Sequence, residues 1–456
     1  MNEFARTGYR FILLGFASLI IGLGFGSISS VQYVLPDFLK EQLSFQKTRP
    51  LHVYLVISWI FNCAAGIIYY YLSTLTVKRY YSKKFASAHF YLQLIILVVV
   101  VAGFLLGKFG GREYLEFPPW VVIIVIASWL CFMTAFFSGI GFVFKSAPLY
   151  IWSWSTGLIF FLVTITEAQL WQLPFFNNNI IRDTTVQWKA LGSMVGSWNM
   201  LVYGTAMYVM EKITGDTRVN QSPIAFFFYF LGLTNLMFNW GHHTYIVPAS
   251  PVVKNVAFII SMTELLILGK ILFTWRKNYL ATVPFEKHPS IGTYTWGDAW
   301  IFLNLVLAIL ISVPAVNLYT HGTHITVAHA MGATIGINTV LLLAAVIFVV
   351  NKNSNRFRIR GNFLNTAVTL MNIFLLIFWI SLLGMGIAKA LGEKEQQSFY
   401  AVMKTLKPWF EIFSISGVIV FIILGIIAVS LSRQIMLLLA GTGKDTEAEK
   451  QLTAIR

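Results

Sequence analysis

Long apolar segments separated by short polar loops run along the whole chain. An apolar run of about 20 residues crosses a bilayer as a helix. We predict twelve such spans, centred on residues 9–30, 51–76, 86–107, 119–144, 147–168, 187–211, 222–246, 254–275, 297–318, 323–350, 363–391 and 408–437. No polar stretch between them is long enough for a soluble domain. The pattern therefore predicts an all-α membrane protein with a single polytopic domain over residues 1–456.

The composition supports a bilayer environment. Hydrophobic residues make up 57% of the chain, charged residues 11%, and the mean hydropathy is +0.72, whereas soluble domains carry about 25% charged residues. The two cysteines, Cys63 and Cys131, both lie in apolar runs. They are too few for a disulfide framework or an iron–sulfur cluster.

Basic residues gather in alternate loops. The net charge is +15, but no basic stripe with interleaved aromatics occurs outside the loops, so we expect no nucleic-acid partner. Membrane proteins carry such an excess on the cytoplasmic side. In the twelve-span prediction the basic groups on one side are Arg6, Arg10, Lys78, Arg79, Lys83, Lys84, Arg276, Lys277, Arg356, Arg358, Arg360, Lys444, Lys450 and Arg456. Both termini are therefore predicted to be cytoplasmic.

Six of the eight histidines fall in three places. His52 stands near the start of an early span, His242 and His243 end another, and a third group precedes a later span. That third group comprises His321, His324 and His329, with Met331 two residues further on. Imidazoles at membrane depth are costly unless something binds them, and a metal or haem is the usual partner. The sequence therefore predicts a membrane metalloprotein.

The order of these motifs resembles the large cytochrome b subunit of cytochrome c-dependent nitric oxide reductase, in the haem–copper oxidase superfamily. The matching segments are 32–34, 37–39, 49–52, 58–59, 111–116, 212–215, 241–243 and 316–323, with Glu264 and His329 at family positions. The resemblance covers nearly the whole chain in order. It implies a bundle like subunit I of those oxidases, in a bacterial inner membrane.

Other positions depart from that family. Its sixth helix carries a histidine, a carboxylate and a further glutamate, where this chain has Leu191, Val195 and Asn199. The register is fixed by Gly196 and Trp198, which both chains share. In the tenth helix the family's His-Gly-His becomes His329-Ala-Met331.

The resemblance implies two haems, expected to be of the b type. Residues two apart on a helix point about 200° from each other, so positions 329 and 331 can face different cofactors. His329 is then the ligand of a high-spin haem, whereas His52 and Met331 are the axial ligands of a low-spin haem. A thioether ligand raises the haem potential relative to a second histidine. The alternative is that Met331 only fills space, as methionine often does in apolar cores.

A non-haem metal, expected to be iron, is implied at a reduced site formed by His242, His243 and Glu264, with Glu264 as the catalytic residue. Non-haem iron commonly takes two histidines and a carboxylate. The alternative is that the two histidines only form hydrogen bonds. Glu113 is expected to bind calcium beside the haem propionates, or else to belong to an ordinary charged loop.

Two functions compete on this evidence. The first is a respiratory oxidoreductase that passes electrons from the low-spin to the high-spin haem, with reduction of NO to N2O if the second metal is retained. The alternative is a non-catalytic haem-carrying subunit of a larger respiratory complex. A twelve-helix transporter is disfavoured by the ordered histidines. The sequence has no Cys-x-x-Cys-His motif for covalent haem, so we expect a cytochrome c-type membrane subunit as donor, docked near residues 109–120.

Overall fold

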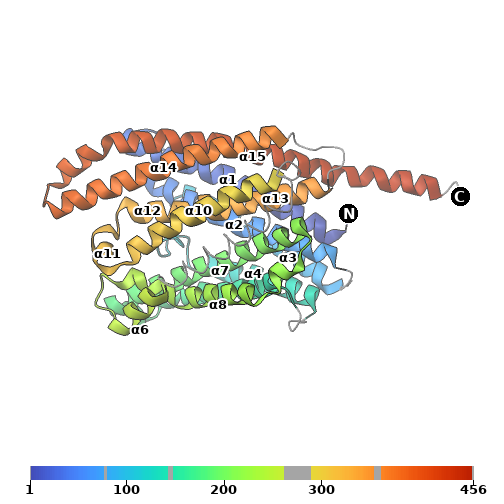
Figure 1. The fold of residues 1–456 in the computed structure, drawn as a ribbon, viewed down its shortest axis with the longest axis horizontal. Coiled ribbons are helices and arrows are strands. Elements are labelled where there is room, and N and C mark those ends of the chain that lie inside the picture. Colours follow the sequence, from blue (N-terminus) through green and yellow to red (C-terminus); the bar gives the residue numbers. More distant parts are fainter. Residues whose placement is uncertain (1, 76–79, 142–146, 261–288, 354–360, 454–456) are drawn as a thin grey trace.

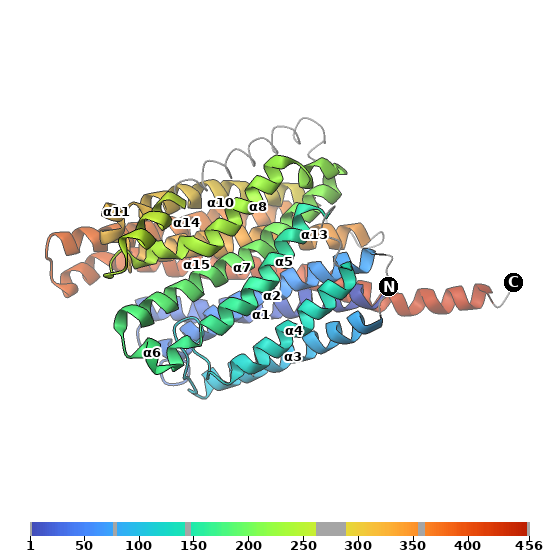
Figure 2. The ribbon, with the colours of Figure 1, turned by 90° about the horizontal axis from the view of Figure 1, so that it is seen from below.

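The protein is a bundle of roughly parallel and antiparallel helices (Figures 1 and 2). The computed structural model describes residues 2–75, 80–141, 147–260, 289–353 and 361–453. Within these ranges the elements are α1 (Glu3–Val34), α2 (Phe45–Thr74), α3 (Tyr80–Leu105), α4 (Val121–Ile140), α5 (Leu149–Glu167), η1 (Leu170–Gln172), α6 (Pro174–Asn177), α7 (Ile180–Thr214), η2 (Thr217–Asn220), α8 (Pro223–Phe238), η3 (Asn239–Thr244), α10 (Pro289–Ser312), α11 (Pro314–Thr320), α12 (His324–Met331), η5 (Gly332–Thr339), α13 (Val340–Asn353), α14 (Gly361–Lys394) and α15 (Phe399–Thr453). The described residues form no β-strand, so the prediction of an all-α membrane fold is confirmed.

Nine helices within the described ranges are long and apolar enough to cross a membrane. The predicted number of twelve spans is not confirmed. The predicted span 187–211 lies in α7, which also carries charged residues such as Arg182, Asp183 and Lys189. The span 222–246 divides into a 16-residue α8 and the 3₁₀ segment η3. Most of the span 254–275, including Glu264, lies outside the described residues.

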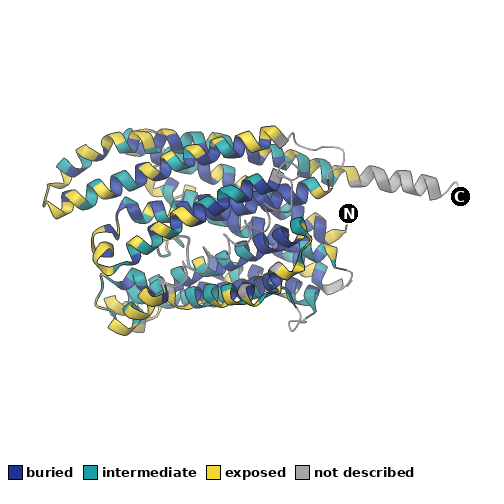
Figure 3. Ribbon diagram, viewed as in Figure 1, coloured by how far each residue is buried: buried dark blue, intermediate teal, exposed yellow. Residues whose placement is uncertain are grey.

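Both termini lie at one end of the bundle, and α6, α11 and the start of α12 lie at the other (Figure 1). The end opposite the termini is called the loop end below. Buried residues concentrate where helices face one another along the middle of the bundle, and exposed ones lie along its outer surfaces (Figure 3). Thus α13, which is enclosed by other helices, is buried at eleven consecutive positions from Val340 to Val350.

Helices α1 and α2 pack closely because glycines lie between them. A Cβ atom at Gly15 would lie 3.1 Å from the Trp59 ring, and one at Gly22 would lie 2.8 Å from Cβ of Leu55. Small residues let helix backbones approach in membranes. The same contact brings His52, on α2, against the backbone of α1.

Candidate functional site

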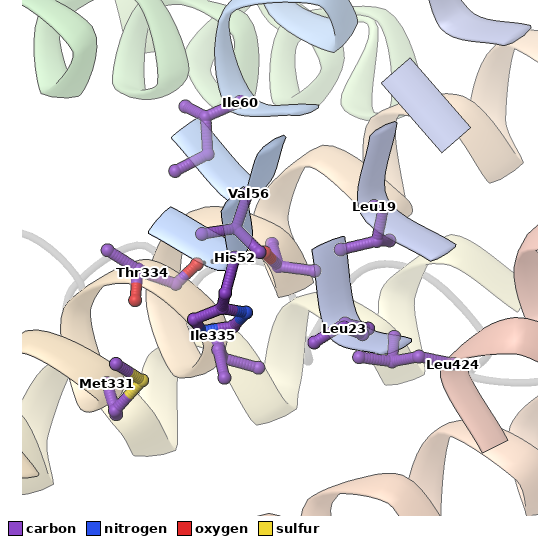
Figure 4. Close-up of a pocket in the computed structure, with 10 residues that line it drawn as sticks. Leu19, Leu23, His52, Val56, Ile60, Met331, Thr334, Ile335 and Leu424 are labelled. Atoms are coloured by element: carbon purple, nitrogen blue, oxygen red, sulfur yellow. Dashed lines mark hydrogen bonds between the residues drawn. The ribbon is translucent and has the colours of Figure 1, made fainter. Parts of the chain in front are cut away.

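His52 and Met331 line one cavity between α1, α2, α15 and the segment that begins at Met331 (Figure 4). Nδ1 of His52 lies 2.8 Å from the carbonyl oxygen of Gly22, to which it can donate a hydrogen bond. That contact fixes the ring and leaves Nε2 for a ligand. The other lining residues are Leu19, Leu23, Val56, Ile60, Thr334, Ile335, Thr339 and Leu424.

The helix carrying Met331 changes its winding at this cavity. The α-helix α12 ends at Met331, and Gly332–Thr339 forms the π-helix η5, a rare conformation that often occurs at functional sites. The hydroxyl of Thr339 donates to the carbonyl of Thr334 and accepts from Nε1 of Trp59, at 2.9 and 3.1 Å. The π-helix is therefore bonded to α2, the helix that carries His52.

The cavity fits a haem by its donor set. A side-chain imidazole and a thioether face an apolar space whose only polar lining groups besides His52 are two threonines. Histidine and methionine form an established axial pair for haem iron. The structure thus brings together the two residues that the sequence analysis paired, although they lie 279 positions apart in the chain.

His329 lies apart from this cavity, as the 200° separation from Met331 predicts. Its buried Nδ1 lies near the backbone of Asn304 but forms no hydrogen bond of normal geometry. Buried polar atoms are almost always satisfied. An imidazole left in this state fits a residue that binds a cofactor or a metal.

A second histidine group lies beside His329. The rings of His242 and His243, on the 3₁₀ segment η3, have centroids 4.3 Å apart, and His321 lies 6.0 Å from His243. The indole of Trp188 stacks on His243 at 4.5 Å with an interplanar angle of 6°. Buried nitrogens of His243 and His321 have no hydrogen-bond partner. Sequence reasoning missed both Trp188 and the proximity of His321, because neither position matches the family motif for metal ligands.

The histidine pair does not form a complete metal site by itself. Among the described residues, no group of three or more His, Cys, Asp or Glu side chains is arranged to hold a metal ion. The third predicted ligand, Glu264, lies outside the described residues.

Helix α7 supplies other contacts where the family has ligands. Leu191 lines a small cavity with Arg112, Glu113 and Gln187. Oδ1 of Asn199 accepts a hydrogen bond from Nδ2 of Asn338 at 3.1 Å. The amide of Asn199 thus ties α7 to the π-helix.

Glu113 stands in a charged loop held by arginines. Its Oε1 accepts from Arg49 at 2.9 Å, and Glu116 also accepts from Arg49. Arg112 donates to both oxygens of Asp183 at 2.7 and 2.8 Å. Burial raises the pKa of the Tyr114 phenol, and the carboxylate of Glu113 raises it further. Calcium takes six to eight oxygen ligands, and here Arg49 occupies both carboxylates of the 111–116 loop.

The helical bundle and the His–Met cavity define a multi-pass membrane protein built to hold haem between its helices. Residues 6–419 match the family described as cytochrome c and quinol oxidase polypeptide I. This match covers most of the chain, and the chain belongs to that family. The haem–copper oxidase resemblance predicted from the sequence is confirmed.

Two curated relatives come from Stutzerimonas stutzeri. The B-type subunit of its nitric oxide reductase is 24% identical over 367 residues, covering 75% of this chain and 74% of the relative. The cbb3-type cytochrome c oxidase subunit CcoN1 is 21% identical over 452 residues, covering 92% and 94%. A haem–copper terminal oxidase dimer solved by cryo-EM matches with a TM-score of 0.72 at 12% identity, covering 96% of this chain and 84% of that one, which shows a shared fold.

Proposed function

We propose that this protein is a haem-carrying electron-transfer subunit of a respiratory oxidoreductase. His52 and Met331 hold a low-spin haem, and His329 holds a high-spin haem, both of the b type. The haems supply one-electron transfer, from the first to the second. The observation that carries the proposal is the shared cavity of His52 and Met331. The orphaned nitrogen of the buried His329 supports the second haem.

We further propose that the electron donor is a cytochrome c-type membrane subunit and that the chain lies in a bacterial inner membrane as one polytopic domain. Curated relatives include a nitric oxide reductase subunit and a cytochrome c oxidase subunit from a bacterium. The loop at residues 109–120 lies between α3 and α4, close to Arg49 and thus to the helix of His52. The basic loops and the shared end of the two termini support cytoplasmic termini.

A second candidate function is reduction of NO to N2O. It is favoured by the similarity to the nitric oxide reductase of Stutzerimonas stutzeri and by the adjacent rings of His242 and His243. The proposed non-haem iron would be held by these histidines and Glu264. Joining two NO molecules needs two electrons, two protons and a site that holds both nitrogens together. Leu191 and Val195 offer no metal ligand, and the electron-transfer function is therefore preferred.

Replacing Met331 tests the proposal. We expect Met331→Ala to remove the six-coordinate low-spin spectrum, because the haem iron loses one axial ligand while His329 keeps the other haem. Met331→His is the matched control. It should restore six-coordination with a lower midpoint potential, since thioether ligation raises the potential relative to imidazole. Optical and magnetic circular dichroism spectra of the purified membrane protein provide the measurement. A Met331→Ala spectrum identical to the wild type would show that Met331 only packs.

A further inference from the structure

The imidazole of His324 has no role in the electron-transfer proposal, yet it occupies a distinctive place. It begins α12, seven residues before Met331. Seven residues turn a helix by about 700°, so both side chains lie within about 20° of one face, and His324 is about 10 Å nearer the loop end. Its ring contacts Phe410 of α15, with centroids 5.5 Å apart. Since α15 also lines the cavity of Met331 through Leu424, His324 and Met331 face the same helix.

Nδ1 of His324 is buried and has no hydrogen-bond partner. Leaving such a group unsatisfied costs about 1–3 kcal/mol, and native structures rarely accept that cost without a reason. A hydrogen-bond acceptor supplied by a ligand is one such reason.

Positive groups surround the same end of the cavity. Arg49 lies one turn before His52 on α2, towards the loop end. Lys389, near the end of α14, is close enough to His324 to act on it electrostatically, and its Nζ lies 3.4 Å from the carbonyl of Gly322. Thus α2, α12 and α14 each place a nitrogen donor towards the loop end from the cavity.

The two propionates of a haem leave one edge of the macrocycle and carry negative charge. A haem whose iron lies between His52 and Met331 can turn that edge towards the loop end, where these donors lie, or towards the apolar middle of the bundle. Burying an unpaired carboxylate in apolar surroundings is strongly unfavourable. The charges therefore favour the first orientation.

We propose that Nδ1 of His324 donates a hydrogen bond to one propionate of the low-spin haem, with Arg49 and Lys389 balancing the charge of the propionate edge. This inference rests on the proposed haem site. It assigns His324 as a cofactor-binding residue.

Two variants test the assignment. We expect His324→Leu to keep both axial ligands, to shift the propionate bending mode of the low-spin haem in resonance Raman spectra and to speed its loss to apomyoglobin about tenfold. Its midpoint potential should fall, because an unpaired propionate stabilises the ferric ion. His324→Gln keeps a donor of similar length and should give intermediate values.

His89→Gln is the matched control. His89 is also a buried imidazole, but it lies on α3 with its Nδ1 2.9 Å from the hydroxyl of Tyr69 and does not line the cavity. We expect it to leave the propionate mode and haem loss unchanged. If the wild type shows a six-coordinate low-spin haem but the His324 variants match it in both measurements, the propionate assignment is wrong and the haem site stands. If the wild type holds no such haem, both proposals are wrong.

Discussion

The position of the His52 ring depends on the absence of a side chain in the neighbouring helix. A Cβ atom at Gly26 would lie 2.5 Å from Nδ1 of His52 and 2.7 Å from its Cε1. Both atoms belong to a ring that is fixed by the carbonyl of Gly22. A methyl group at position 26 would therefore force the imidazole out of its present place.

We expect Gly26→Ala to weaken or remove the low-spin haem, because the displaced imidazole loses its hydrogen bond to Gly22 and its aim into the cavity. Gly24→Ala is the control, since a Cβ atom there meets only the ring of Phe421 at 3.8 Å, an ordinary contact. Both changes have the same helix propensity effect. The measurement is the low-spin haem content per protein, and equal losses in the two variants would contradict the steric argument.

At the scale of elements, the bond between Trp59 and Thr339 joins the two helices that carry His52 and Met331. Both side chains are buried, and Nε1 of Trp59 has the threonine hydroxyl as its acceptor. The same hydroxyl donates within the π-helix. One side chain therefore couples the winding of η5 to its spacing from α2.

A double-mutant cycle measures this coupling. We expect Thr339→Val to lower the free energy of unfolding by about 1–3 kcal/mol, because it leaves the buried indole N–H of Trp59 unsatisfied. Trp59→Phe adds a cavity cost of its own, but the two losses should not add in the double variant. Unfolding of the detergent-solubilised protein in SDS provides the measurement. Strictly additive losses would show that the bond contributes nothing.

The helix η3 shows what an element decides beyond its residues. His242 and His243 are adjacent in the chain, and on a regular α-helix adjacent side chains diverge by about 100°. In the 3₁₀ segment their ring centroids are 4.3 Å apart, and Trp188 of α7 stacks on the second ring. The pairing is therefore set by local winding and by contact with another helix.

At the scale of the whole molecule, the bundle creates two separate histidine environments on the two sides of α12. One holds His52 and Met331, and the other holds His329, His242, His243 and His321. The first contains a complete axial pair, whereas the second has no three-ligand metal group among the described residues.

The metal content of the intact protein follows from this division. After subtraction of any cytochrome c partner, we expect two haems per chain and no further iron or copper, because Leu191 and Val195 remove two ligands of the family site. Metal analysis by mass spectrometry and extractable haem give the ratio. About one additional iron per chain would instead favour NO reduction, and His242→Ala should then remove it. Turnover of NO would be the next measurement.

The sequence by itself determined the all-α membrane fold, the family and the choice of His52, Met331 and His329 as candidate ligands. Apolar runs and rare histidines in a bilayer have few physical explanations, so these features can be read locally. The number of spans could not be read so, because α7 mixes charged ends with an apolar middle and α8 gives way to a 3₁₀ turn.

Only the tertiary structure decided which distant residues meet. Trp188 beside His243, Asn199 beside Asn338 and Trp59 beside Thr339 are contacts between helices. They depend on helix rotation and close approach, and no local pattern encodes either. The π-helix belongs to the same class: its extra width follows from side-chain bonds and packing around Met331, whereas the sequence alone predicts one continuous α-helix.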